Sequence, residues 1–111
     1  MLINILLCVL PAYTFEESLV NLEKSWKITI TYLNAARRKL PEEMVFLEAK
    51  AAEKDFNEYL KHNELELAMN ALDDMGLLSN APDEFWFDLE LAASNMGLLV
   101  EAKRFNRIRD T

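Results

Sequence analysis

Apolar residues recur along most of the chain at steps of three and four positions, the spacing that places them on one face of an α-helix. The first long run predicts a helix that a capping box at Thr14 and Glu17 opens and that extends to about Lys39. A local alternation over residues 28–32 is typical of a strand, but the longer helical period outweighs it. The side chains of Ile28 and Tyr32 are then expected to be buried on a second side of this helix. Its main inner face is expected to hold Phe15, Leu19, Leu22, Trp26, Ile30, Leu33 and Ala36.

The first ten residues are apolar except for Asn4. They lack the positively charged start and the small-residue cleavage site of a signal peptide. They are also too few to span a bilayer. Residues 2–10 therefore predict a short helix, packed into the core and stopped by Pro11.

Two further helices are predicted between residues 41 and 75. Pro41, followed by Glu42 and Glu43, suits the first turn of the earlier one. Asn63 and Glu66 form a second capping box, so the chain is expected to bend near residues 62–63. The inner positions are Val45, Ala49, Ala52, Phe56 and Tyr59 or Leu60 in the first of these helices, and Leu65, Ala68, Met69, Leu72 and Met75 in the second.

The remaining chain predicts two more helices. One begins near Pro82, with Ser79 or Asn80 as its cap and two acids in its first turn. This helix has a broad apolar face, and Phe87 and Leu91 lie on the opposite side of the helix. The last helix runs from about residue 99 to 108 and is basic on its outside. The apolar face of the earlier helix holds Phe85, Trp86, Leu89, Ala92, Ala93 and Met96.

The two glycines of the chain, Gly76 and Gly97, each stand between a methionine and a pair of leucines. Glycine tolerates the left-handed conformation that follows many helix ends, and an apolar residue after it often folds back onto the last turn. Both glycines are therefore expected to end a helix with positive φ. Together with a length of 111 residues, these patterns predict an all-α, single-domain bundle of about five to six helices.

The charge of the chain is unevenly distributed. Residues 41–101 hold three lysines against fifteen acids, a balance of -12, whereas residues 1–40 and 102–111 carry +2 and +3, which gives the net -7. Such an acidic stretch repels nucleic acid and attracts a basic partner. The alternative is that the acids only keep the helix surfaces solvated.

Candidate catalytic and metal-binding groups are few. The single cysteine, Cys8, and the single histidine, His62, exclude an internal disulfide and a multi-histidine metal site. Glu58, His62 and Glu66 would share one helical line, but the predicted bend at residue 63 separates them. Acids adjacent in a helix point in different directions, and the two glycines form no phosphate-binding loop. The basic end over residues 103–109 has one aromatic, which is little for a nucleic-acid surface. We therefore expect no enzyme activity, no cofactor and no metal.

A resemblance to a known family is carried by three stretches of the last two-thirds of the chain. They are Leu40-Pro41-Glu42-Glu43, then Phe56-x-x-Tyr59-Leu60-x-His62-x-Glu64-x-x-x-Ala68, and Asp83-Glu84-Phe85 leading to Leu91-Ala92-x-x-x-Met96-Gly97-Leu98. This pattern resembles the small helical immunity proteins of bacterial polymorphic toxin systems, and most of all the MafI-type and contact-dependent growth inhibition immunity proteins. The resemblance implies an all-helical cytoplasmic antitoxin that binds one cognate toxin domain, often a nuclease, and it brings no catalytic residues.

The functional hypothesis is therefore an immunity protein that neutralises a basic toxin domain, an RNase or a DNase, by stoichiometric binding. Contact with nucleic acid or a membrane is not expected, and the oligomeric state is left open. The alternatives are a small acidic adaptor or secretion chaperone and, in a third class, an enzyme with clustered carboxylates. The predicted partner-binding residues combine an off-stripe apolar pair with nearby acids. They are Glu66, Asp73, Asp74, Asp83, Glu84, Phe87, Asp88, Glu90 and Leu91.

Overall fold

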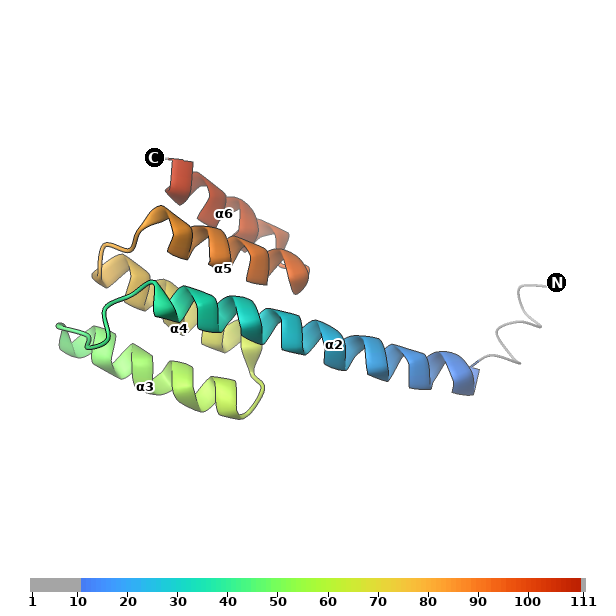
Figure 1. The fold of residues 1–111 in the computed structure, drawn as a ribbon. Helices are drawn as coiled ribbons and strands as arrows, with labels where there is room; N and C mark the ends of the chain where they lie inside the picture. Colours follow the sequence, from blue (N-terminus) through green and yellow to red (C-terminus); the bar gives the residue numbers. More distant parts are fainter. Residues whose placement is uncertain (1–10, 111) are drawn as a thin grey trace.

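The computed structural model describes residues 11–110, and side chains from Leu19 onward. This part of the chain forms five helices and no strand, which confirms the all-α prediction (Figure 1). The predicted helix at residues 2–10 lies outside the described residues. None of the described helices is long and apolar enough to span a bilayer. The helices are α2 (Pro11–Arg38), α3 (Leu47–Lys61), α4 (Leu65–Leu78), α5 (Asp83–Asn95) and α6 (Leu99–Asp110).

Helix α2 already includes Pro11, so the capping box predicted at Thr14 does not open it. Proline fits the first turn of a helix because its fixed φ is helical and its missing N–H has no intrahelical partner there. Residues 28–32 are helical, as the longer period predicted, and the helix ends at Arg38, one residue before the predicted end. Ile28 is exposed, so its burial on a second side was predicted wrongly.

The length of α2 exceeds that of every other helix. Its 28 residues span about 42 Å at 1.5 Å per residue, whereas the other helices have 12–15 residues. Its N-terminal half therefore extends beyond the bundle (Figure 1). Leu33 and Ala36 are buried as predicted, but Leu19, Leu22 and Trp26 are exposed. The helical period was predicted correctly. The predicted burial of this half was wrong, because no other described helix lies against it.

The helix predicted to start at Pro41 begins only at Leu47. Arg37 donates hydrogen bonds to the carbonyls of Pro41 (3.0 Å) and Glu42 (2.9 Å), and so takes acceptors that a helix starting at Pro41 would use. The connecting loop also buries Leu40 and Met44. As a result Val45, predicted to face inward, is 82% exposed.

The chain bends at residues 62–64 as predicted, but Asn63 is not an N-cap. It follows the end of α3 with φ 58°, and its N–H donates to the carbonyl of Leu60. The N–H of Glu64 donates to the carbonyl of Tyr59 (2.8 Å), which completes a left-handed helix end of the kind that asparagine tolerates. Helix α4 then starts without a side-chain cap, so the second capping box was also wrong.

The two glycines differ, contrary to the prediction. Gly97 has φ 76° and ends α5, with the N–H of Leu98 donating to the carbonyl of Ala93 (2.8 Å). Gly76 lies inside α4, which continues to Leu78 and is followed by Asn80 with φ 52°. The prediction is therefore confirmed for Gly97 and wrong for Gly76.

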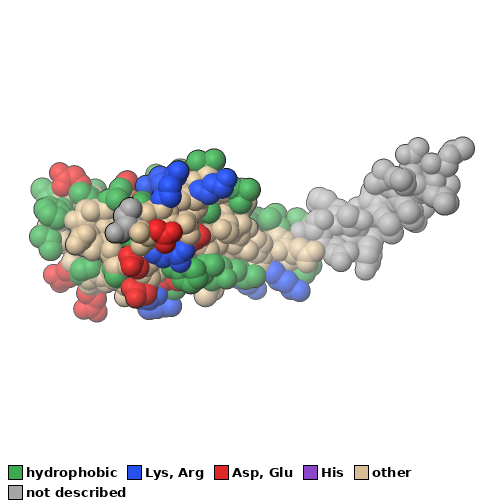
Figure 2. Space-filling model, turned by 90° about the horizontal axis from the view of Figure 1, so that it is seen from above, with side chains coloured by type: hydrophobic (Ala, Val, Ile, Leu, Met, Phe, Trp, Pro, Cys, Tyr) green, Lys and Arg blue, Asp and Glu red, His purple; other side chains and the backbone are tan. Residues whose placement is uncertain are grey.

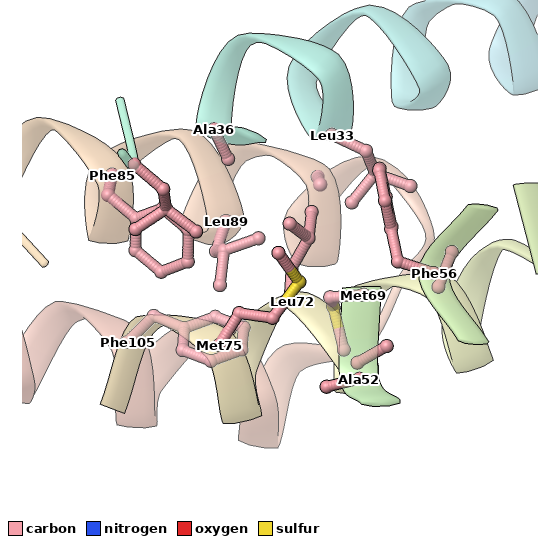
Figure 3. Packing of buried hydrophobic residues seen from close by; sticks show 14 of the residues in the cluster. Leu33, Ala36, Ala52, Phe56, Met69, Leu72, Met75, Phe85, Leu89 and Phe105 are labelled. Atoms are coloured by element: carbon pink, nitrogen blue, oxygen red, sulfur yellow. The ribbon is translucent and has the colours of Figure 1, made fainter. Parts of the chain in front are cut away.

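The core lies between α4 and α5, with α2, α3 and α6 packed around them (Figure 3). The ring of Phe85 meets that of Trp86 edge-on at 4.8 Å between centroids, and Trp86 stacks on Phe105 at 5.9 Å. The predicted inner positions of α4 and nearly all those of α5 are buried; Met96, just after the end of α5, is half-buried. In α3 the buried positions are Ala49, Ala52 and Phe56.

Candidate protein-binding site

Four of the fifteen central acids pair with basic residues of other helices or of the chain just after α2. Glu53 pairs with Arg37, and Asp73 pairs with Arg104. Asp88 accepts from Lys39 Nζ at 2.6 Å, and Glu90 lies 3.1 Å from Arg109. These pairs fasten α2, α3, α4, α5 and α6 to one another. Three of the predicted partner-binding residues, Asp73, Asp88 and Glu90, are therefore engaged within the chain.

The pair Phe87 and Leu91 lies off the buried stripe of α5, as predicted, and Arg109 of α6 reaches this side of the helix. Phe87 is 43% exposed, and the guanidinium of Arg109 lies 4.9 Å from the centroid of its ring. Leu91 is half-buried. Arg109 also pairs with Glu90, so one of the acids expected around Phe87 is neutralised within the chain.

The other predicted residues are spread over the molecule. Glu66 lies in the first turn of α4, while Asp83 and Glu84 lie exposed in the first turn of α5. Asp74 is exposed near the end of α4. The structure therefore does not gather the predicted set into one surface.

A different surface combines apolar side chains with free carboxylates. It lies at the end of the bundle away from the N-terminal half of α2, where the loop before α3 meets the end of α4 (Figure 1). We call it the end patch. Its apolar side chains are all exposed, with Phe46 at 53%, and they are Val45, Phe46, Leu47, Leu77 and Leu78.

Two shallow hollows divide the end patch. One, of about 320 Å³, is lined by Val45, Phe46 and Leu78 together with polar groups of both loops. The other, of about 280 Å³, lies beside Leu77 and Leu78 and is bordered by Glu48 and Asp74. Because Leu78 lines both hollows, they belong to one continuous surface.

Four exposed carboxylates surround the end patch. They belong to Glu42, Glu43, Glu48 and Asp74, and none of them forms an ion pair with a described residue. Figure 2 shows hydrophobic and acidic side chains together at this end of the molecule. Four unpaired acids of the central segment are thus placed next to Val45 and Leu47, the two most exposed large apolar side chains among the described residues.

Arg37 holds the loop that carries half of the end patch. Besides its two bonds to loop carbonyls, its Nε donates to Glu53 Oε2 at 2.9 Å. Glu53 belongs to α3, so one guanidinium joins the end of α2, the loop and the following helix. This arrangement fixes Val45 and Phe46 on the surface, although both are apolar.

The end patch was missed from the sequence because two apolar groups were assigned to helix faces. Val45 was placed on an inner stripe, and the pair Leu77 and Leu78 was interpreted as a hook after Gly76. A usable signal was present: residues 44–47 are four consecutive apolar residues. A helix cannot turn four consecutive residues toward one core, since each step rotates by about 100°.

Acidic and histidine side chains are the groups that could serve metal or acid–base chemistry in this chain. Within residues 11–110, no three His, Cys, Asp or Glu side chains are placed to hold a metal ion. His62 Nε2 lies 3.6 Å from Glu58, both side chains being exposed, while Glu66 belongs to the next helix.

Asp73 is a half-buried carboxyl whose surroundings shift its pKa. Burial raises the pKa of Asp73, the nearby guanidinium of Arg104 opposes that rise, and the neighbouring charge of Asp74 adds to it. Its buried Oδ1 accepts no hydrogen bond from the described residues. Because Arg104 covers this carboxyl, its role is to hold α4 against α6.

An apolar cluster inside a charged rim is the usual construction of a protein-binding hot spot. The end patch has this construction, with a rim of one sign. It is therefore suited to a protein partner whose surface is basic around an apolar centre. Comparisons with models of protein families, with curated proteins and with solved structures find no match to the chain, so function is inferred from the site itself.

Proposed function

We propose that the protein is an immunity protein, which neutralises a cognate basic toxin domain by binding it in a stoichiometric complex. The observation that supports this proposal is the end patch: exposed Val45, Phe46 and Leu47 lie beside carboxylates that have no partner among the described residues. A surface of this kind costs solubility and serves no packing purpose in the isolated bundle. Its chemistry fits the partner that the family resemblance implies.

The charge of the end patch indicates the class of toxin. A nuclease domain carries a basic surface, because it must hold the phosphates of RNA or DNA. The rim carboxylates attract such a surface over a distance and speed the encounter. Phe46 and Leu47 then exclude water from the contact and slow dissociation. Inhibition in this proposal consists of covering the toxin's substrate-binding surface, with no bond made or broken.

The decisive experiment tests whether the gene directly upstream of this one encodes a toxin domain that this chain neutralises. The two are co-expressed in a toxin-sensitive bacterium, and growth is compared with that of cells that carry the toxin alone. We expect growth to be restored and a one-to-one complex to be purified. If the neighbouring gene encodes a secreted effector or an apparatus component and no toxin, the immunity proposal is contradicted and the adaptor class is favoured.

A matched pair of variants locates the binding surface. Phe46→Ala and Phe87→Ala each remove one phenyl ring of similar exposure, 53% and 43%. The first ring belongs to the end patch, and the second belongs to the surface of α5 that the sequence predicted. Truncation of a hot-spot residue costs about 2 kcal/mol or more, which is about thirtyfold in Kd. We expect this loss from Phe46→Ala, while Phe87→Ala leaves Kd within a few-fold. A larger loss of affinity from Phe87→Ala than from Phe46→Ala would place the toxin-binding site on α5 instead.

A further inference from the structure

One apolar seam runs along α2 from Leu19 to Ala36, and only half of it is covered. Its positions alternate in steps of three and four, the 3.5-residue period of helices that pair along their length. Toward the bundle, Thr29 is 1% exposed, and Leu33 and Ala36 are fully buried. Toward the N-terminus, the same seam continues through Leu19, Leu22 and Trp26, all of them exposed.

The change from covered to bare seam occurs at a polar contact between α2 and α5. Asn95 Nδ2 donates to Thr29 Oγ1 at 2.8 Å and to the carbonyl of Ser25 at 2.9 Å. Asn95 is the last residue of α5, so the bundle offers no further α5 surface beyond this point. The Asn95 contact anchors α2 at the place where it leaves the bundle.

A hollow of about 300 Å³ lies at this exit, and we call it the shoulder groove. Its walls combine the seam residues Leu22 and Trp26 with Met96 and Leu98 from the chain that follows α5. Glu66 stands at its edge. The bare seam thus continues directly into a partly apolar groove, which extends the surface available to a second helix.

A bare amphipathic helix of this length is not stable by itself. Isolated helices of about 12–15 residues are marginal in water, and most helical stability in proteins comes from packing of the apolar face. The bare seam of α2 therefore requires a cover. The charges beside the bare seam indicate which kind of surface covers it.

Among residues 19–28 of α2, the exposed charges are those of Glu23, Lys24 and Lys27, which sum to +1. A basic toxin gains no attraction here, in contrast to the end patch with its four carboxylates. Two copies of the seam, being nearly neutral and apolar, meet without marked repulsion.

We propose that a second copy of this chain covers the seam, so that two α2 helices pack antiparallel across a twofold axis. The antiparallel direction places the two acidic bundles at opposite ends of the helix pair, whereas a parallel pair would bring them side by side. It also directs the N-terminal part of each α2 toward the partner's shoulder groove. Leu19 then packs against Leu22 of the partner subunit. This inference does not depend on the proposed function, because the end patch lies at the far end of each bundle.

The oligomeric state of the full chain tests the pairing. We expect light scattering and sedimentation equilibrium to show a dimer that dissociates on dilution. Leu22→Glu, which places a charge in the seam, is expected to give a monomer whose helix content outside α2 is retained. The control Ile28→Glu changes a residue of equal exposure on the same helix, 45% against 44%, but off the seam, and it is expected to remain a dimer. A monomeric wild-type chain at every concentration, or a dimer that survives Leu22→Glu, would overturn the proposal.

Disulfide trapping tests the direction of the helices. In a Cys8→Ser background, the Leu19→Cys and Leu22→Cys chains are mixed and oxidised mildly. The antiparallel pair brings position 19 to the partner's position 22, so the mixed disulfide is expected to dominate over both homodisulfides. A parallel pair would join each cysteine to its own counterpart, and dominance of homodisulfides would refute the antiparallel arrangement. Toxin binding by the Leu22→Glu monomer separates the two proposals, since the end patch is intact in it.

Discussion

The ring of Phe85 packs so closely on the backbone of Gly76 that a Cβ at position 76 would lie 2.6 Å from Phe85 Cζ. Gly76 is inside α4 and Phe85 is in the first turn of α5, so this contact sets how near the two helices approach. Phe85 is fully buried and touches Trp86, which leaves its ring no room to withdraw. The glycine is present for space, not for a turn.

Gly76→Ala is therefore expected to destabilise the bundle, although alanine is the better helix former. Overpacking costs about 1–3 kcal/mol, and this loss outweighs the gain of about 1 kcal/mol in helix propensity. Chemical denaturation measures the free energy of unfolding. Adding Phe85→Leu to Gly76→Ala should recover part of the loss, whereas the same change in the wild type should only destabilise. Equal stability of Gly76→Ala and the wild type would contradict the tight contact.

Gly97→Ala is expected to cost about 1 kcal/mol for a different reason, because a Cβ is disfavoured at φ 76°. Nothing lies within 4 Å of the added carbon, so no overpacking contributes. Gly97→Asn should cost less, as asparagine tolerates this conformation and already occupies it at position 63. Thermal unfolding of the two variants provides the comparison. A loss for Gly97→Asn as large as for alanine would exclude the conformational explanation.

Arg37→Lys is expected to loosen the loop of the end patch while keeping the charge. Lysine lacks the planar fork with which Arg37 reaches two carbonyls and Glu53 at once. Loss of these bonds is expected to lower stability by about 1–2 kcal/mol. Hydrogen exchange should speed up over residues 40–47, and toxin binding should weaken. Arg38→Lys, at the exposed neighbouring position, is the control and should change neither.

The buried carboxyl of Asp73 is expected to make stability depend on pH in an unusual direction. Its pKa is raised in the folded chain above the ordinary 3.8, so the folded state holds this proton more tightly than the unfolded state. The contribution of Asp73 is therefore fully present below pH 3.8 and is lost as the pH rises through the raised pKa.

Denaturation of the wild type and of Asp73→Asn over a pH series tests this expectation. The difference in unfolding free energy, wild type minus variant, should fall as the pH rises through that window and then stay level. The comparison with the variant removes the titration of the other carboxylates. A difference that increases with pH would show that Arg104 outweighs burial and lowers the pKa of Asp73.

Association with a basic toxin domain is expected to slow steeply as salt rises, while dissociation changes less, because the rim charges act mainly during encounter. Stopped-flow mixing measures both rates. Replacing Glu42, Glu43 and Glu48 by glutamine should flatten the salt dependence of association. Glu58→Gln, which removes an exposed acid outside the end patch, should leave it nearly unchanged. An association rate independent of salt would rule out steering.

Helical periodicity, which is a local property, determined much of this protein. The periodic spacing of apolar residues predicted an all-α chain and nearly all the buried faces of α4 and α5. Short local signals, at Asn63 and at Gly97, predicted the bend near His62 and the start of the last helix at Leu99. Gly97 was predicted correctly for the same reason, since a helix end is decided by the few residues around it.

Tertiary packing decided the rest. Gly76 and Gly97 have the same neighbours in sequence. Position 76 nevertheless needs a glycine only because a ring from another helix packs against it. Likewise Pro41 suits a helix start, and only Arg37 reaching across the loop prevents it. Three predicted binding acids, Asp73, Asp88 and Glu90, have ion-pair partners at least nineteen positions away along the chain. The positions at which the helices meet in space decide which acids remain free and which half of the α2 seam is covered. These positions cannot be inferred from the apolar period of a single helix.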